Sequence, residues 1–410
     1  MKLAAIAFRN IQRNRRRSIL SGSAIALATL IIAFMFAWLA GILGDYRANI
    51  INYLTGHVRL RNAQYDANER LNPLHLSVPG YRELVPLLEA EPGVAAAAPR
   101  IQFATAIYRE EQTFGSLGLG VDFARERQLM RIGDSLVQGR LPDMGRREVL
   151  LGAGLAEEAG ATVGDRLTLL GKNKHLGLAG MTFRVTGIAR FPVAGFNRRF
   201  LLVPIDTAEL MLKMENEATE ILLLARDERR LEELAARAGE LASAAGATGV
   251  EARPWESIGM WHGLIRMVDS MYYFIALFFM VLGTTVIVNT TMMVIFERMR
   301  EIGTVSALGM KPGEIVRLFF LEAFFISLIA AFAGALAGTG ITLALGRNGV
   351  DLSRMLQGTD LEVSPVVRPR LSLRSTLVVF LYSVAVSSVA SFLPSRRAAR
   401  IRPVEALRSI

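Results

Sequence analysis

The hydrophobic residues of this 410-residue chain are concentrated in four long segments. These segments cover about residues 19–43, 271–296, 315–345 and 374–393, and each contains 20 or more residues with few charges. A stretch of this length and composition can cross the hydrocarbon core of a bilayer as a helix. The pattern therefore predicts four transmembrane helices.

Residues 44–270, between the first two apolar segments, have the mixed composition of a soluble domain and are long enough to bury a core. Two parts of this stretch, about 55–105 and about 218–258, repeat one order of patterns. Each has a strand-like run, then an amphipathic helix, then a Gly-Val pair that opens a second strand. Two such units predict an α/β sandwich of split ferredoxin type. The first helix has its apolar residues at Tyr81, Leu84, Val85 and Leu88.

The stretch between these two halves, about 106–217, has a different pattern. Short runs alternate apolar and polar residues and are separated by turns rich in glycine, as half-buried strands are. We therefore predict a β-rich insertion within the domain. The expected fold class is a membrane α-helical protein with a large α/β domain inserted between its first and second spans.

The formal net charge of +10 is carried by the two ends of the chain. Residues 1–18 hold six basic side chains and no acid, and residues 394–410 hold five arginines against one glutamate. Basic residues next to apolar spans mark the cytoplasmic side of a membrane. Because four spans return the chain to its starting side, we expect residues 297–314 to be cytoplasmic. Residues 44–270 and 346–373 should then be external.

A charged run directly follows the second apolar segment and reads Glu-Arg-Met-Arg-Glu-Ile-Gly-Thr-Val-Ser-Ala-Leu-Gly over residues 297–309. We predict a short helix at the membrane edge, with Glu297 and Glu301 on one face because they are four residues apart. Gly309 and the Lys-Pro-Gly sequence at 311–313 end this helix and turn the chain. A charged helix between two spans can receive force from a soluble partner. The simpler alternative is a helix end that is only solvated.

Two features inside the third span are candidates for function. Gly334 and Gly338 form a small-xxx-small pair, which predicts close helix packing within the chain or across a dimer. Glu322 is an acid inside the predicted span, and an intramembrane acid is a functional candidate. The alternative for Glu322 is a side chain that reaches back to the cytoplasmic surface.

The sequence has no residue pattern typical of a catalytic or metal site. It lacks the Walker A pattern of nucleotide-binding proteins, and its four histidines have no metal-ligand spacing. It has no cysteine, which excludes thiol and disulfide chemistry. Because the basic ends border membrane spans, they favour contact with anionic lipid headgroups over nucleic acid. We therefore do not expect an enzyme, a metal site or a nucleic-acid-binding protein.

Three strings of residues carry a resemblance to a known family. The coupling string E-R-x-R-E-I-G-x-x-x-A-L-G-x-x-P lies at 297–312, and E-V-L-L-G-x-x-L-A-x-x-x-G-A-x-x-G-D-x-L-T-L lies at 148–169. The third is the basic tail 394–408, which reads P-S-R-R-A-A-R-I-R-P-V-E-A-L-R. In this order they resemble the FtsX/MacB-like ABC transporter permeases, the type VII mechanotransmission permeases. The LolC/LolE-type chains are the most similar in layout.

This resemblance implies a bacterial cytoplasmic (inner) membrane protein with a large periplasmic domain made of a porter and a sabre part. Residues 44–53 and 260–274 would form a stalk that continues the first two spans. A second permease copy or a paralogue would complete a dimer, and a separate dimer of ABC ATPase subunits would bind ATP and Mg. The chain itself would bind no cofactor. Membrane lipids and a periplasmic carrier or adaptor are the other partners that the resemblance implies.

The resemblance also assigns roles to residues of the charged run. The acids would pair with basic groups in a groove of the ATPase, and the leucine would add apolar anchoring. The residues implied for ATPase coupling are Glu297, Arg298, Arg300, Glu301, Leu308 and Gly309.

Three functions stay open at the level of sequence. The first is lipoprotein release or export of another envelope substrate. The second is MacB-like efflux of peptides or amphiphiles with a separate ATPase, and the third is FtsX-like signalling to a cell-wall hydrolase. In LolC-type chains a protruding hook recruits a carrier, whereas the matching segment here, 171–182, is short.

Overall fold

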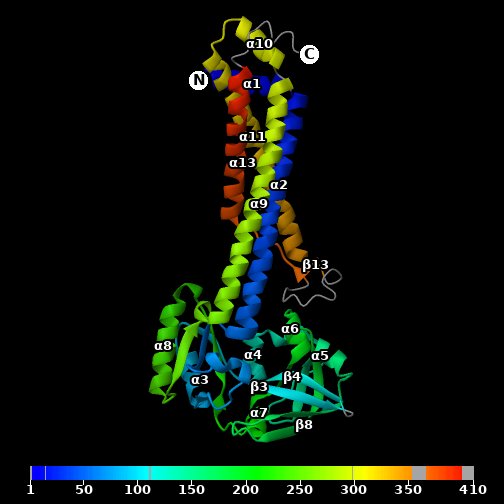
Figure 1. Cartoon of the computed structure of the whole chain (residues 1–410), viewed down its shortest axis with the longest axis vertical. Helices are drawn as coiled ribbons and strands as arrows, with labels where there is room; N and C mark the ends of the chain where they lie inside the picture. The colour runs from blue at the N-terminus through cyan, green and yellow to red at the C-terminus, as the bar shows by residue number, and fades with distance from the viewer. Residues whose placement is uncertain (1, 14, 110–111, 298, 353–365, 399–410) are drawn as a thin grey trace. The chain divides into compact units, whose positions relative to one another are not determined.

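The structure is a computed structural model, and its chain divides into two compact units (Figure 1). The described stretches are residues 2–13, 15–109, 112–297, 299–352 and 366–398. Of the described residues, the first unit, called the helical unit, combines those within 2–44, 267–352 and 366–398. The second, called the sheet domain, combines those within 45–266.

The helical unit is built from the apolar segments of the sequence. Its helices are α1 (Lys2–Arg13), α2 (Arg15–Asn49), α9 (Gly259–Glu297), α10 (Met299–Ala307), α11 (Pro312–Asn348) and α13 (Leu373–Ala398). Four of them, α2, α9, α11 and α13, contain stretches long and apolar enough to cross a membrane. These stretches lie where the hydrophobic pattern predicts spans, so that prediction is confirmed. Both α2 and α9 extend past the unit boundary into residues of the sheet domain.

The two ends of the helical unit carry different elements. The basic helix α1 and the helix α10 lie at one end, and the short strand β13 (Val350–Asp351) lies at the other (Figure 1). β13 pairs antiparallel with β14 (Val366–Val367). After β14, the backbone N–H of Arg370 donates to the carbonyl of Ala37 at 3.0 Å, which ties this connection to α2. α1 and the charged run therefore lie at the same end of the helical unit, because α2 leads the chain away from this end and α9 leads it back (Figure 1).

The sheet domain opens with a π-helical turn, Ile50–Thr55, that continues α2. Its strands are β1 (Val58–Asn62), β2 (Val78–Pro79), β3 (Val94–Arg109), β4 (Gln112–Val121), β5 (Leu136–Gly139), β6 (Glu148–Gly152), β7 (Arg166–Lys172), β8 (Leu178–Ala189), β9 (Phe200–Pro204), β10 (Glu217–Ala218), β11 (Glu220–Ala225) and β12 (Val250–Pro254). Its helices are α3 (Tyr81–Ala90), α4 (Phe123–Leu129), α5 (Ala153–Glu158), α6 (Ala194–Arg199), α7 (Ile205–Leu212) and α8 (Leu231–Ala244).

Two strand-helix-strand units form one end of the main sheet, as the repeated pattern predicts. The units are β1-α3-β3 and β11-α8-β12, and their strands lie in the antiparallel order β12-β1-β11-β3. The helices α3 and α8 contact each other and the strands of this sheet. The predicted split ferredoxin arrangement is therefore confirmed. It forms because both helices bury their apolar stripes on one face of the sheet.

The predicted β-rich insertion extends the same sheet. Beyond β3 the strand order continues β4-β9-β6-β8-β5, and β7 pairs with β3 and β8. The sequence places the end of the first half near residue 105, but β3 runs on to Arg109, with Ile107 buried and Tyr108 exposed. The inward and outward alternation thus continues through the predicted limit. One core of buried apolar side chains is shared by the halves and the insertion.

Candidate functional site

The charged run folds as a short helix between two long ones. α9 ends at Glu297, α10 spans Met299–Ala307, and α11 starts at Pro312. Gly309 takes a φ of 93°, a left-handed conformation that glycine adopts without a steric cost. The backbone N–H of Lys311 then donates to the Glu314 carboxylate at 3.1 Å and caps α11. The predicted stop and turn after α10 is confirmed.

The predicted coupling residues are only partly described. Glu301 and Gly309 are exposed, and Leu308 is 83% exposed. Arg298 lies outside the described residues. The predicted common face of Glu297 and Glu301 is not tested, because the Glu297 side chain lies outside what the structure describes. The same is true of the side chain of Arg300.

The predicted small-residue pair packs against the first span of the same chain. A methyl group added to Gly334 would lie less than 3.0 Å from the Ala26 carbonyl oxygen on α2. At Gly338 an added methyl would lie 3.2 Å from the Leu30 carbonyl oxygen. The two backbones therefore approach closely at these glycines, as membrane helices do at small residues.

Glu322 is buried against the N-terminal helix. Its side chain is 2% exposed, and its Oε1 accepts a hydrogen bond of 2.7 Å from Nδ2 of Asn10 on α1. Nearby, Phe8 of α1 meets Phe325 of α11 edge to face, with ring centroids 6.1 Å apart. Glu322 therefore has a partner on α1, and neither its functional role nor the alternative that it reaches the cytoplasmic surface is tested by this contact.

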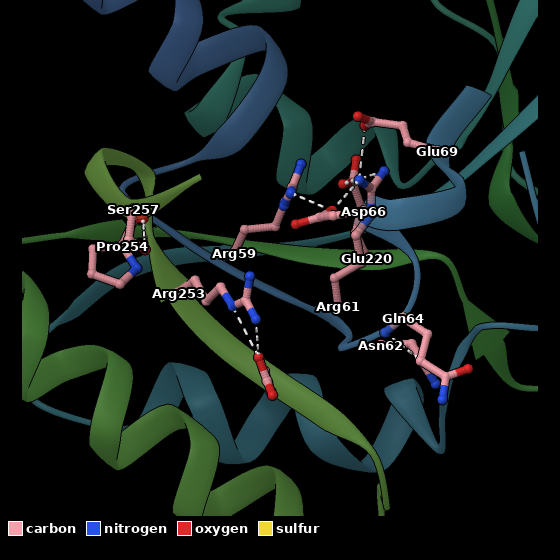
Figure 2. A network of polar contacts seen from close by, with 11 residues as sticks. Arg59, Arg61, Asn62, Gln64, Asp66, Glu69, Glu220, Arg253, Pro254 and Ser257 are labelled. Atoms are coloured by element: carbon pink, nitrogen blue, oxygen red, sulfur yellow. Dashed lines mark hydrogen bonds and ion pairs between the residues drawn. The ribbon is translucent and has the colours of Figure 1, made fainter. Parts of the chain in front are cut away.

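The sheet domain holds a buried charge network that the sequence analysis missed (Figure 2). Arg59 and Arg61 of β1 are each 4% exposed, although both lie on the face of the sheet opposite α3 and α8. The turn Asp66–Leu71 covers them, and Asp66 accepts from Arg59 at 2.7 Å and from Arg61 at 3.0 Å. Glu69 accepts from Arg61 at 2.9 Å.

Charge within this network shifts the pKa of Arg61. Burial is the largest single influence and lowers that pKa, but Glu220, whose carboxylate is 3.3 Å from the Arg61 guanidinium, acts together with Tyr65 and Glu69 to raise it overall. For Tyr65, whose ring lies under Arg61, burial raises the pKa of the phenol. Arg61 is therefore a fixed cation that balances buried acids, and Tyr65 stays neutral.

A second buried pair lies on the same face of the sheet. Arg100 of β3 is directly opposite Glu220 in the strand register, and Glu220 is opposite Arg61. The Arg100 guanidinium binds the Glu126 carboxylate on α4, with Nε to Oε1 at 2.6 Å and Nη2 to Oε2 at 2.9 Å. Both side chains are almost completely buried, at 1% and 0% exposed. Alternation alone predicts a solvated face here, so no sequence signal marked these residues.

The segment that matches a carrier hook is a short β-hairpin. β7 and β8 pair from Arg166 and Arg184 to Lys172 and Leu178, which leaves a five-residue turn. The turn folds back on the domain, because Nζ of Lys174 binds both carboxylate oxygens of Glu217 at 2.5 and 2.6 Å. The side chains of Leu176 and Leu178 are exposed at this turn.

The described residues contain no group of three histidine, cysteine, aspartate or glutamate side chains that could hold a metal ion. His57 has a structural partner, because its Nδ1 accepts from the backbone N–H of Ala225 at 3.0 Å. The described residues thus combine an exposed charged helix, α10, with a sheet domain that buries ion pairs such as Arg100 with Glu126.

Comparison with models of protein families shows to which family the chain belongs. The model of the MacB-like periplasmic core domain matches residues 18–241, more than half of the chain, and that of the FtsX-like permease C-terminal region matches residues 273–403. The chain belongs to the FtsX/MacB-like permease family. The two matches divide the chain as this permease layout requires, with a periplasmic-type domain between the first and second spans.

Curated relatives match most of the length of this permease. The lipoprotein-releasing system transmembrane protein LolC of Neisseria meningitidis is 24% identical over 80% of this chain and 81% of its own length. LolC of Xylella fastidiosa is 22% identical over 98% of both chains. The macrolide export ATP-binding/permease protein MacB 2 of Aeromonas hydrophila is 27% identical over 80% of this chain but only 48% of its own length. The chain is thus a multi-pass ABC transporter permease with an extracytoplasmic domain.

Proposed function

We propose that this permease releases lipoproteins, or exports another envelope substrate, from the bacterial inner membrane. The observation that carries the proposal is the likeness to LolC of Xylella fastidiosa over 98% of both chains, which covers the spans and the sheet domain together. The relative with an ATP-binding part, MacB 2, is matched over only about half its length.

In this proposal a separate ABC ATPase supplies the energy, since the 410 residues lack a Walker A pattern. ATP and Mg bind to the ATPase. The exposed Glu301 and Leu308 give its groove a charged and an apolar contact, next to Glu297, Arg298, Arg300 and Gly309. The α1 and α10 end of the helical unit faces the cytoplasm, and the sheet domain lies outside.

Motion is passed on by packed helices in this proposal, and no polar path through the spans is needed. Gly334 sets a close approach of α11 to α2. Among the buried hydroxyls of the described spans, Thr342 donates to the Gly338 carbonyl and Ser388 to that of Val384, whereas Thr291, Ser383 and Ser387 have no hydrogen-bond partner. We propose that these hydroxyls do not form the polar lining that a water-filled path needs. Two permease copies would move together on ATP binding.

The turn between β7 and β8 helps to indicate which periplasmic partner the chain has. Because Lys174 holds the turn against Glu217, the segment has little reach for recruiting a carrier. The chain then takes the LolE-like place beside a paralogue, or it works with an adaptor. MacB-like efflux of peptides or amphiphiles is the second candidate, favoured by the likeness to MacB 2. FtsX-like signalling fits the large sheet domain less well.

A charge reversal tests the coupling role. We expect Glu301→Lys to weaken binding of the partner ATPase by about tenfold or more, because a paired charge at an interface becomes a repulsive one. Glu232→Lys, which makes the same charge change on the exposed face of α8, is the matched control. Co-purification and substrate release are measured with both variants. Normal assembly and release by Glu301→Lys would refute the assigned role.

A reconstituted assay separates the two candidate substrates. The permease and its ATPase are placed in proteoliposomes that hold either a fluorescent triacylated lipoprotein or an amphiphilic dye. ATP-dependent appearance of the lipoprotein in the aqueous phase is the expected result. Dye efflux without lipoprotein release would instead establish the MacB-like function.

A further inference from the structure

The end of α2 is a widened turn that is inserted into the sheet domain. The π-helical turn Ile50–Thr55, called the stalk turn, is closed by Gly56, whose N–H donates to the Ile51 carbonyl at 2.8 Å. Gly56 has a φ of 63°, so the chain leaves the helix by a conformation that favours glycine. The helix that begins with the first span therefore ends at Gly56, so a displacement of α2 along its axis would be passed to the sheet domain through the stalk turn.

An aromatic cluster packs against one side of the stalk turn. The Tyr53 ring packs edge to face on Phe191 and Phe196, with ring centroids 5.9 and 5.6 Å apart. Its hydroxyl donates to the Met130 carbonyl at 3.1 Å. Such contacts resist separation of the turn from the domain, and they add about 0.5–1.5 kcal/mol per ring pair beyond burial.

The Arg100 guanidinium donates hydrogen bonds to backbone carbonyls of the same turn. Its Nη1 donates to the Tyr53 carbonyl at 2.6 Å, and its Nη2 lies 3.4 Å from the Asn52 carbonyl. Carbonyls in the last turn of a helix lack a partner within the helix and carry its negative dipole end, which suits a cation. The other edge of the guanidinium is occupied by Glu126.

Glu126 is itself fixed in place. It lies on α4, whose first turn is capped by Asp122, with Oδ1 accepting from the N–H groups of Ala124 and Arg125 at 2.9 and 3.3 Å. α4 packs on β3, the strand that carries Arg100 and crosses from the first half into the insertion. One planar guanidinium thus joins three elements: the stalk turn, α4 and β3.

The geometry points to Arg100 as the positioning residue through which movement of the first span is delivered to the sheet. This inference rests on the proposed function, since it presumes that ATP-driven movement reaches α2. A buried ion pair adds little net stability over apolar packing of the same shape. Its directional hydrogen bonds, however, fix the turn against α4 and β3, whereas apolar surfaces can slide.

The test separates this role from a merely structural one. Arg100→Met alone leaves Glu126 buried without its partner, so the double variant Arg100→Met/Glu126→Leu removes both charges and keeps the packing. Arg127→Met, in the last turn of the same helix, removes an exposed arginine and is the matched control. The full chain with its ATPase is placed in nanodiscs, and amide hydrogen exchange is followed by mass spectrometry, with and without ATP, Mg and vanadate.

The first result concerns the stalk turn without nucleotide. We expect the double variant to exchange amides 50–57 about tenfold faster than the wild type, because two carbonyl contacts of the turn are lost. Exchange in α3 and α8 should be unchanged, as it should be everywhere in Arg127→Met. Unchanged exchange at 50–57 in the double variant would overturn the inference.

The second result concerns the response to nucleotide, which a loss of local stability alone would not abolish. In the wild type, ATP with vanadate should alter exchange in β3 and α4, and in the double variant this difference should vanish. A difference that persists in the double variant would overturn the role of Arg100. No difference in the wild type would instead overturn the proposed function, whatever the first result.

Discussion

The two units of the permease hold their interiors together in different ways. The sheet domain buries charged groups in pairs, such as Arg61 with Glu220 and Arg100 with Glu126. The described helices of the helical unit approach through glycine and bury hydroxyls, some of which bond their own backbone. In lipid there is no hydrophobic drive between helices, so close backbone approach has to supply the contact energy. In water, burial of the apolar core supplies the main driving force, and buried charges add directional contacts to it.

The largest expected effect lies in the charge network of the sheet domain. Arg61→Met leaves Glu220 without its ion-pair partner and should lower the free energy of unfolding by about 3–5 kcal/mol. Arg253→Met, on the neighbouring strand, removes an exposed pair with Glu251 and should cost far less. Thermal unfolding of both variants checks this. Equal losses would mean that the burial of the network does not matter.

The next effect tests close approach in the helical unit. Gly334→Ala forces a methyl group against the Ala26 carbonyl and should destabilise the unit by about 1–3 kcal/mol. Gly340→Ala lies on the same helix, where an added methyl meets nothing within 4 Å, and should be neutral or slightly stabilising. The melting temperatures of the two variants and of the wild type, measured in detergent, check this prediction. A neutral Gly334→Ala would show that α11 and α2 do not depend on this contact.

An effect of similar size but confined to one helix is expected where α1 meets the third span. Asn10→Ala removes a hydrogen bond to the buried Glu322 carboxylate, and bonds to charged groups contribute about 1.5–3 kcal/mol. The loss is local, so α1 should become accessible to protease while the remaining helices stay protected. Gln12→Ala, an exposed position on the same helix, is the control. If both variants are cut at the same rate as the wild type, the bond does not hold α1.

The smallest effect is a pH dependence of the sheet domain. Burial lowers the pKa of His57 below 6.5, although the Glu228 carboxylate partly offsets this. The unfolded state then binds a proton more readily, so stability should fall as the pH drops through about 6.5. His57→Gln should make the fall in unfolding midpoint between about pH 7.5 and 5.5 shallower. An identical fall in both proteins would exclude His57 as its source.

Local patterns in the sequence predict much of this structure. Apolar length identifies the four spans, helical spacing identifies α3 and α8, and the glycine at 309 with the following Lys-Pro-Gly marks the end of α10. Each of these features depends on residues close together in the chain, where spacing and backbone preference decide the conformation.

The buried polar contacts could not be predicted in the same way. Alternation along β1 assigns Arg59 and Arg61 to a solvated face, and only the turn that covers them makes them buried. The row Arg61, Glu220 and Arg100 depends on a strand register between distant segments. Likewise, the hydrogen bond between Asn10 and Glu322 joins residues that are 312 positions apart in the sequence.

The central claim, that ATP-driven motion reaches the sheet domain through the helices, is tested most directly by locking the stalks. The chain has no cysteine, so Ser270→Cys introduces a single site at which two permease copies can form a disulfide. Oxidation should stop substrate release while ATP binding by the partner continues, and reduction should restore release. The oxidised cysteine-free chain should work normally. Continued release with the disulfide formed would contradict the account and favour an alternating-access path through the spans.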